Sequence, residues 1–189
     1  MVGMSEQLIV LGAQTLRIED IVAVARHGAS VELSQAALER IAASRRVVES
    51  LAADVEPHYG VSTGFGALAT RHIPVELRAQ LQRSLVRSHA AGSGAEVERE
   101  VVRALMTLRL ATLATGRTGV RPEVATTYAA MLTAGITPVV QEYGSLGCSG
   151  DLAPLAHCAL AAMGEGPVRL SDGTPSDSAA ALEAHGIPP

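Results

Sequence analysis

The sequence predicts a mainly α-helical domain with few short strands. Several stretches of about ten to twenty residues repeat apolar side chains at the spacing of an amphipathic helix. Aromatic residues make up only 2% of the 189 residues, although 48% are hydrophobic. The core must therefore consist of Ala, Leu and Val, which suits closely packed helices. This length supports one domain, residues 1–189, with a sizeable core.

The first third of the chain predicts one short strand, two helices and a break. Residues 8–11 are apolar and predict an edge strand, and residues 17–26 predict a helix. Ser34 can cap a longer helix that runs to about residue 53. The Gly-, Ser- and Thr-rich stretch 57–66 then interrupts the helical pattern. The residues expected to face inward are Ile18, Ile21, Val22 and Ala25 in the first helix, and Leu38, Ile41 and Val48 in the second.

Five more helices are predicted in the rest of the chain. The helix predicted over 75–91 is strongly periodic, and Pro122 suits the first turn of the helix predicted over 122–133. A loop over 135–150 precedes the helix predicted over 151–163, which is apolar almost all round and is expected to be buried. The predicted ranges are 75–91, 96–115, 122–133, 151–163 and a short helix within 164–189; Leu77, Leu81 and Leu85 form the stripe of the first.

Composition excludes several classes of function. All fifteen basic residues are arginine, so a lysine Schiff base with pyridoxal phosphate (PLP) is impossible within this chain. The net charge of −4 offers no basic patch for nucleic acid, and no apolar run is long enough to span a membrane. Without a secretory signal or a Cys-x-x-Cys pair, the sequence predicts a reduced, cytoplasmic protein.

Two segments upstream of the 135–150 loop can carry chemistry. Tyr59 begins a loop, Tyr-Gly-Val-Ser-Thr-Gly-Phe-Gly, that could be a mobile active-site loop or simply structural. Its glycines do not follow a β-branched strand, which argues against a dinucleotide site. His89 continues the apolar stripe of the helix over 75–91, so it is either a core histidine or a ligand-binding one. No histidine or acidic partner at helical spacing supports a metal site there, and no metal is expected.

The tripeptide Cys148-Ser149-Gly150, in a glycine-rich turn before a helix, is the most informative segment about function. In a tightly bent turn the Gly150 nitrogen can attack the Cys148 carbonyl. Loss of two waters, one from the Ser149 side chain, then leaves an electrophilic methylene. Glycine allows the close backbone approach that this ring needs. The alternatives are a helix cap made by Ser149 or Asp151 and a Cys148 nucleophile; a serine-hydrolase elbow would need a different glycine spacing.

Together these three segments resemble the aromatic amino acid ammonia-lyases. The resemblance covers the whole chain and is carried by residues 59–66, 84–92 and 144–155 in the family's order. It implies the N-terminal part of a helical-bundle fold, and a 4-methylideneimidazole-5-one (MIO) group formed autocatalytically from Cys148, Ser149 and Gly150. Many members have alanine at the first of these positions.

The resemblance also implies roles for individual residues. Tyr59 is expected to remove the β-proton of the substrate, and Ser149 to supply the reactive methylene. The Ser88-His89 pair matches histidine-selective members, so both residues are expected to bind the substrate, together with Gly66. Asp151, where the next helix begins, is expected to support the ring through the helix dipole. The implied reaction is deamination of L-histidine to trans-urocanate and ammonia.

Tyr59 is a weak base at an ordinary tyrosine pKa near 10. Lowering that pKa by about three units requires roughly 4 kcal/mol of preferential phenolate stabilisation. One helix N-terminus supplies about 0.3–2 kcal/mol. Several aligned helix ends or cationic groups are therefore expected around the phenol.

The family's proteins are more than twice as long as this chain and assemble as homotetramers. We therefore expect the C-terminal helical bundle to be absent and the site to be completed by further copies or by a complementing C-terminal polypeptide. The alternatives are a phenylalanine or tyrosine lyase, an aminomutase, and a catalytically silent assembly fragment. A silent fragment would expose an apolar helix face formed by Val101, Leu105, Leu108 and Leu113.

Overall fold

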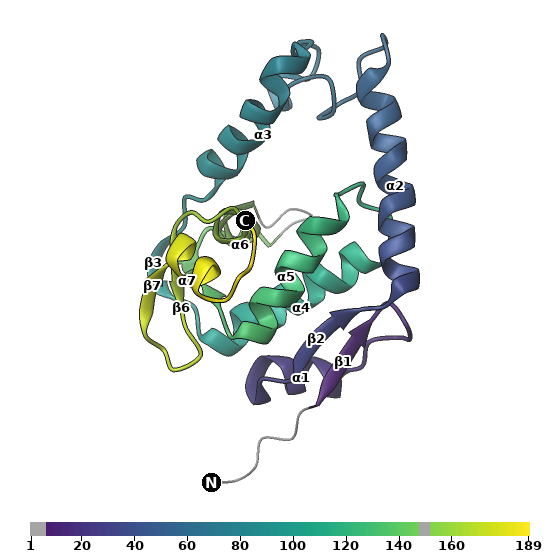
Figure 1. The fold of residues 1–189 in the computed structure, drawn as a ribbon. Coiled ribbons are helices and arrows are strands. Elements are labelled where there is room, and N and C mark those ends of the chain that lie inside the picture. The colour runs from purple at the N-terminus through teal and green to yellow at the C-terminus, as the bar shows by residue number, and fades with distance from the viewer. Residues whose placement is uncertain (1–6, 148–151) are drawn as a thin grey trace, which may run out of the picture.

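Figure 1 shows the computed structural model of the chain, which describes residues 7–147 and 152–189. Helix α4 (Arg99–Ala114) packs against α1 (Ile18–His27) and α5 (Pro122–Ala134) at the base of the molecule. From this base α2 (Gln35–Ala53) and α3 (Val75–His89) rise on either side and are joined at the top by residues 54–74 (Figure 1). The mainly α prediction is confirmed.

Within the described residues, the strands are short and lie in three small sheets. The parallel pair β1 (Leu8–Leu11) and β2 (Ser30–Leu33) lies beside α1, with Ile9 opposite Val31. The other sheets are antiparallel: one pairs β3 (Ser93–Glu96) with β5 (Gln141–Tyr143), and one has the order β4 (Thr137–Pro138), β6 (Pro167–Arg169), β7 (Pro175–Asp177). The remaining elements are the 3-10 turn η1 (Gly66–Leu68) and the helices α6 (Leu152–Ala162) and α7 (Ser178–Ala184).

Local signals set several helix ends, and those at Ser34 and Pro122 are as predicted. The Ser34 hydroxyl accepts a hydrogen bond from the Ala37 amide at 3.1 Å, which caps α2. Pro122 is the first residue of α5, where its missing N–H costs nothing. Gly135 ends α5 with φ near +73°, a left-handed conformation that glycine adopts without a Cβ penalty.

Three sequence expectations need correction. Residues 93–98 are not helical: they form β3 and its exit, so α4 begins at Arg99 instead of residue 96. The 135–150 loop contains β4 and β5. Ile18, expected to face inward, is 76% exposed, whereas Ala25 is buried as expected, together with Ala23 and Val24. Small side chains thus let α1 approach α4 closely, and burial does not follow the larger apolar residues.

The core of the base encloses one charged side chain, Arg103 on α4, which is fully buried. Its guanidinium donates to the carbonyl oxygen of Val24 near the end of α1 and to that of Leu132 in the last turn of α5. Burial lowers the pKa of Arg103 to about 10. Met106 and Leu110 on the same helix, and Ile136 after α5, belong to the hydrophobic core.

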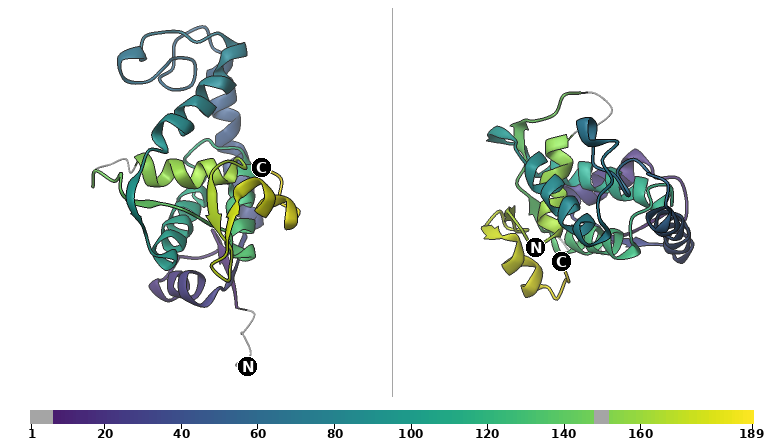
Figure 2. Two further views of the ribbon diagram at one scale, coloured as in Figure 1. Left: turned by 90° about the vertical axis from the view of Figure 1, so that its left-hand side faces the viewer. Right: turned by 90° about the horizontal axis from the view of Figure 1, so that it is seen from above.

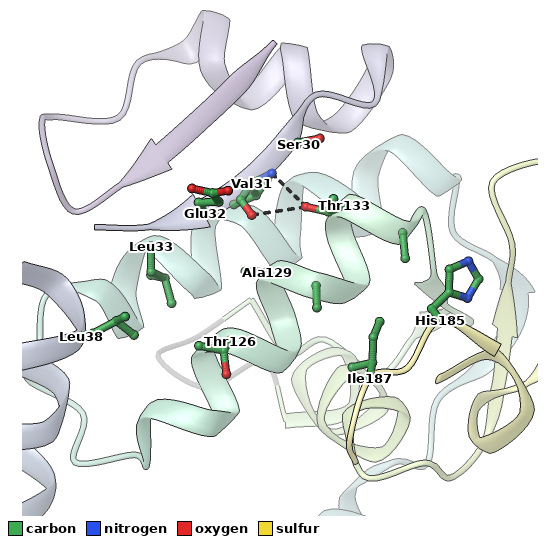
Figure 3. Close-up of a pocket in the computed structure, with 12 residues that line it drawn as sticks. Ser30, Val31, Glu32, Leu33, Leu38, Thr126, Ala129, Thr133, His185 and Ile187 are labelled. Atoms are coloured by element: carbon green, nitrogen blue, oxygen red, sulfur yellow. Dashed lines mark hydrogen bonds between the residues drawn. The ribbon is translucent and has the colours of Figure 1, made fainter. Parts of the chain in front are cut away.

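The open edge of β2 meets a hydroxyl from α5. Thr133 Oγ1 accepts from the Val31 amide at 2.9 Å and donates to the Val31 carbonyl at 3.2 Å (Figure 3). The side chain therefore takes both main-chain groups that a further strand would use at that position.

Helix α3 makes its principal contact with the rest of the chain through α6, which lies beside it in both views of Figure 2. None of its residues is buried, and Leu77 on the predicted stripe is 47% exposed. Helix α6 is buried or half-buried along its length, with Ala156 and Cys158 among the buried residues, except at Leu152, which is exposed. No helix in the described part of the chain is both long and apolar enough to cross a membrane.

Candidate active site

The loop that begins at Tyr59 projects at the top of the molecule, between α2 and α3 (Figures 1 and 2). Tyr59 is 65% exposed, and its ring meets that of Phe65 edge to face, with centroids 5.8 Å apart. The Gly66 amide donates to the Tyr59 hydroxyl at 3.4 Å. The loop therefore presents the phenol outward, with Gly66 directly beside it.

Buried hydroxyls beneath Tyr59 hold the loop in shape. Ser62 and Thr63 are fully buried. The Ser62 hydroxyl accepts from the His58 amide at 2.9 Å, and that of Thr63 accepts from the Gly60 amide at 3.3 Å. The small polar residues that mark this stretch as a break in the sequence thus supply its internal hydrogen bonds.

Side chains of α3 contact both the end of α2 and this loop. The Arg78 guanidinium donates to the Ala52 carbonyl at the end of α2 and to the Ile73 carbonyl. The Gln82 amide donates to the Gly60 carbonyl at 3.4 Å. Below the loop, Asp54 binds His58 Nε2 at 2.9 Å, and this hydrogen bond lowers the pKa of the Asp54 carboxyl.

Ser88 and His89 are the last two residues of α3. The carbonyl oxygen of Leu85 lies 2.8 Å from His89 Nδ1 and 2.9 Å from the Ser88 hydroxyl, and it accepts from both. In a neutral ring this assigns the proton of His89 to Nδ1 and leaves Nε2 as an acceptor. The half-buried ring is thus held on the helix by one nitrogen.

The structure does not bring Tyr59 and His89 together within one chain. Among the described residues, the hydrogen bonds of each stay within its own segment. The loop contacts α3 at Gln82, seven residues before His89. At 1.5 Å per residue, this separates the two ends by about 10 Å along the helix.

The third predicted segment is described only at its two sides. Cys148, Ser149, Gly150 and Asp151 lie outside the described residues, so their roles stay predictions. On the N-terminal side, Gly144 packs against the start of α6: a Cβ there would stand 2.7 Å from the Cβ of Ala153 and 3.3 Å from the Cα of Gly92. The two ends of the segment 144–153 are therefore in contact, and only glycine fits at the first.

The sequence analysis missed His157 on α6. Its Nε2 accepts a hydrogen bond from the Gly92 amide at 3.1 Å. Gly92 lies three residues after His89 in the chain. Burial lowers the pKa of His157, in keeping with a neutral ring that accepts. Its signal was a single polar side chain in an otherwise apolar helix, which predicts a hydrogen bond in the interior but not its partner.

A cavity of about 590 Å³ lies away from these residues, between β2, α5 and the C-terminal end (Figure 3). Thr126, Thr133, His185 and Ile187 line it, and none of the candidate site residues does. Within residues 7–147 and 152–189, no group of three or more His, Cys, Asp or Glu side chains could hold a metal ion.

Comparison with known proteins gives consistent matches over the chain. The family model described as aromatic amino acid lyase matches residues 16–189. The histidine ammonia-lyase of Streptomyces griseus is 68% identical over 96% of this chain, which covers 35% of that protein. That of Streptomyces coelicolor is 64% identical over the same shares. The chain thus spans about a third of the length of these relatives.

Solved structures share the same arrangement of helices. An ergothioneine-degrading enzyme from Treponema denticola superposes with a TM-score of 0.92 at 32% identity, over 97% of this chain and 36% of that one. The histidine ammonia-lyase of Trypanosoma cruzi gives 0.86 at 31%, over 97% and 35%. A tyrosine aminomutase from Streptomyces globisporus gives 0.87 at 38%, over 96% and 34%.

Proposed function

This chain belongs to the aromatic amino acid lyase family, and we propose that it forms the N-terminal, MIO-forming domain of an enzyme that converts L-histidine to trans-urocanate and ammonia. The observation that carries the proposal is the 68% identity to a histidine ammonia-lyase over 96% of the chain. The pair Ser88-His89, with one ring nitrogen of His89 left to accept, supports histidine as the substrate.

The MIO group, formed from Cys148, Ser149 and Gly150, supplies the electrophile that makes the substrate's amino group a good leaving group. The close approach of Gly144 to Ala153 supports this assignment, because it holds together the two ends of the segment that contains these three residues. No lysine is present that could hold a pyridoxal cofactor instead. Asp151 supports the ring from the start of the helix.

His89 binds the substrate imidazole in this proposal. With its Nδ1 proton donated to Leu85, the neutral ring offers Nε2 to an N–H of the substrate. Ser88 holds the same carbonyl and keeps the end of the helix in place. A substrate ring without an N–H leaves this acceptor unpaired, which disfavours phenylalanine.

Tyr59 takes the β-proton, and Gly66 places its hydroxyl. At 65% exposure the phenol has no enclosed pocket around it in a single chain. A site that uses both Tyr59 and His89 is therefore completed by another polypeptide: a further copy, as in a homotetramer, or the C-terminal part that the longer relatives possess. We place this assembly in the cytoplasm.

Intact mass and product formation test the proposal. The mature chain should weigh two waters less than its sequence, and Ser149→Ala should restore the full mass. Supplied with a C-terminal polypeptide from a relative, the chain should release ammonia and urocanate from histidine. Full unmodified mass in that complex would refute the proposal, and a β-amino acid product would favour the aminomutase alternative.

A further inference from the structure

The end of α3 is held to α6 at two points. Near one end of the contact, Arg87 binds Glu165, just beyond α6, through two nitrogen–oxygen pairs at 2.8 and 2.7 Å. Near the other, the Gly92 amide donates to His157 Nε2 at 3.1 Å. Since α3 has no buried residues, these two contacts help to fix the position of its last turn.

The contact at Gly92 is the more restrictive one. A Cβ on residue 92 would stand 3.1 Å from His157 Nε2 and 3.0 Å from Gln141 Oε1, so the imidazole meets the bare backbone. Gln141 Oε1 is buried and finds no hydrogen-bond partner among the described residues, so it does not compete for the amide. Arg87 and Glu165, by contrast, are partly exposed, and such pairs are individually weak.

Gly92 lies three residues after His89, whose ring is fixed on the last turn of α3. His157 belongs to the helix that begins at Leu152, directly after the segment predicted to form the electrophile. The hydrogen bond therefore ties the residue that binds the substrate to the helix that follows the reactive group.

We propose that His157 is a positioning residue, which fixes His89 relative to α6 by accepting a hydrogen bond from the Gly92 amide. The inference rests on the proposed function for the role of His89, and on the structure alone for the hydrogen bond. His157 itself does not touch the substrate. Its effect reaches the reaction through the backbone of residues 89–92.

Three substitutions separate the acceptor from the bulk of the side chain. His157→Gln places an amide oxygen about where Nε2 lies and keeps the bond. His157→Asn is one methylene too short, and His157→Leu keeps the bulk without an acceptor. His27→Leu, at the exposed end of α1, is the matched control.

Amide hydrogen exchange on the 189-residue chain tests the bond without any assay of activity. Exchange of the Gly92 amide should become about 2- to 12-fold faster in His157→Asn and His157→Leu, the range expected for one hydrogen bond. It should stay at the wild-type rate in His157→Gln and His27→Leu. An unchanged Gly92 rate in His157→Asn overturns the inference, whether or not the chain is a lyase.

Kinetics in the completed enzyme test the link to His89. His157→Asn should raise KM for histidine several-fold with a smaller change in kcat, and His157→Gln should restore it, while the two-water mass deficit persists in both. In a His89→Leu background, His157→Asn should raise KM no further, because its effect passes through His89. Additive effects on KM would overturn the positioning role, whereas an inactive wild type would instead refute the proposed function.

Discussion

Arg103 and Val24 are joined by two hydrogen bonds to one carbonyl oxygen, from Nε at 3.1 Å and Nη2 at 2.8 Å. The same guanidinium reaches Leu132 at 3.0 Å. Carbonyls near a helix C-terminus carry partial negative charge and lack partners within the helix. One buried cation therefore binds carbonyls near the C-terminal ends of two helices and helps to fix the directions of these helices relative to α4.

Replacing Arg103 should destabilise the base of the molecule. Arg103→Met leaves the Val24 carbonyl without its two donors, at a cost of about 1–3 kcal/mol. The Leu132 carbonyl loses one donor but keeps the Gly135 amide, so its contribution to the loss should be smaller. Arg103→Lys should restore only part of the loss, because an ammonium cannot reproduce the planar fork. Denaturant unfolding measures both. The exposed Arg46→Met serves as the control, and an equal loss in that variant would contradict the account.

Gly144→Ala should impair formation of the electrophile. A Cβ at residue 144 would stand 2.7 Å from that of Ala153, which is too close for two carbon atoms, so the ends of the segment must separate. We expect most of the two-water mass deficit to disappear. Gly173→Ala, at a positive φ in open space, should retain it. Full maturation of Gly144→Ala would show that this contact is dispensable.

Tyr59→Phe should lower kcat of the completed enzyme by about 10²- to 10⁴-fold, the usual contribution of a general base. KM and the mass deficit should change little, since the ring remains. Tyr143→Phe is a matched control, because Tyr143 is also 65% exposed and has no role in the proposal. A kcat that falls equally in both variants would argue against Tyr59 as the base.

His157 should make stability depend on pH in the mildly acid range. Burial lowers the pKa of His157 below its ordinary value of 6.5, so the unfolded chain binds a proton more readily than the folded one. Its contribution is fully present above about pH 6.5 and is lost as the pH falls through the lowered pKa. The free energy of unfolding should decline more between about pH 6.5 and 5 in wild type than in His157→Gln. Parallel curves would contradict this.

Cys158 should be inert in the folded protein. It is buried, and burial raises the pKa of its thiol to about 12, so almost no thiolate exists near neutral pH. Peptide mapping after iodoacetamide treatment should find Cys158 unmodified in native protein and modified in urea. Equal alkylation under both conditions would mean that α6 opens readily.

Much of the helical framework follows from local sequence. Ser34 and Pro122 act on their own helix ends, and the structure places both as predicted. The strand predicted over 8–11 is present as β1, but the other strands, of two to four residues, carry too short a pattern to recognise. Within the predicted apolar face of α4, Val101 and Leu108 are half exposed but Leu113 is buried, because burial depends on which helices pack there.

The candidate site could also be predicted only in part from the sequence. The residues of each segment could be read from the sequence, since each motif is continuous. The contact between Gly92 and His157 could not, because it joins residues 65 positions apart. Nor could the separation of Tyr59 from His89, which depends on how the loop after α2 folds over α3.

The bond between Thr133 and Val31 bears on how the protein behaves at high concentration. A two-stranded sheet with a bare edge invites a strand from a neighbouring molecule, and such pairing grows into fibrils. Here one hydroxyl already occupies the amide and carbonyl at the middle of that edge. An incoming strand would have to displace the Thr133 side chain before it could pair with Val31. Thr133, which lies outside the sheet, therefore hinders the addition of a third strand at the β2 edge.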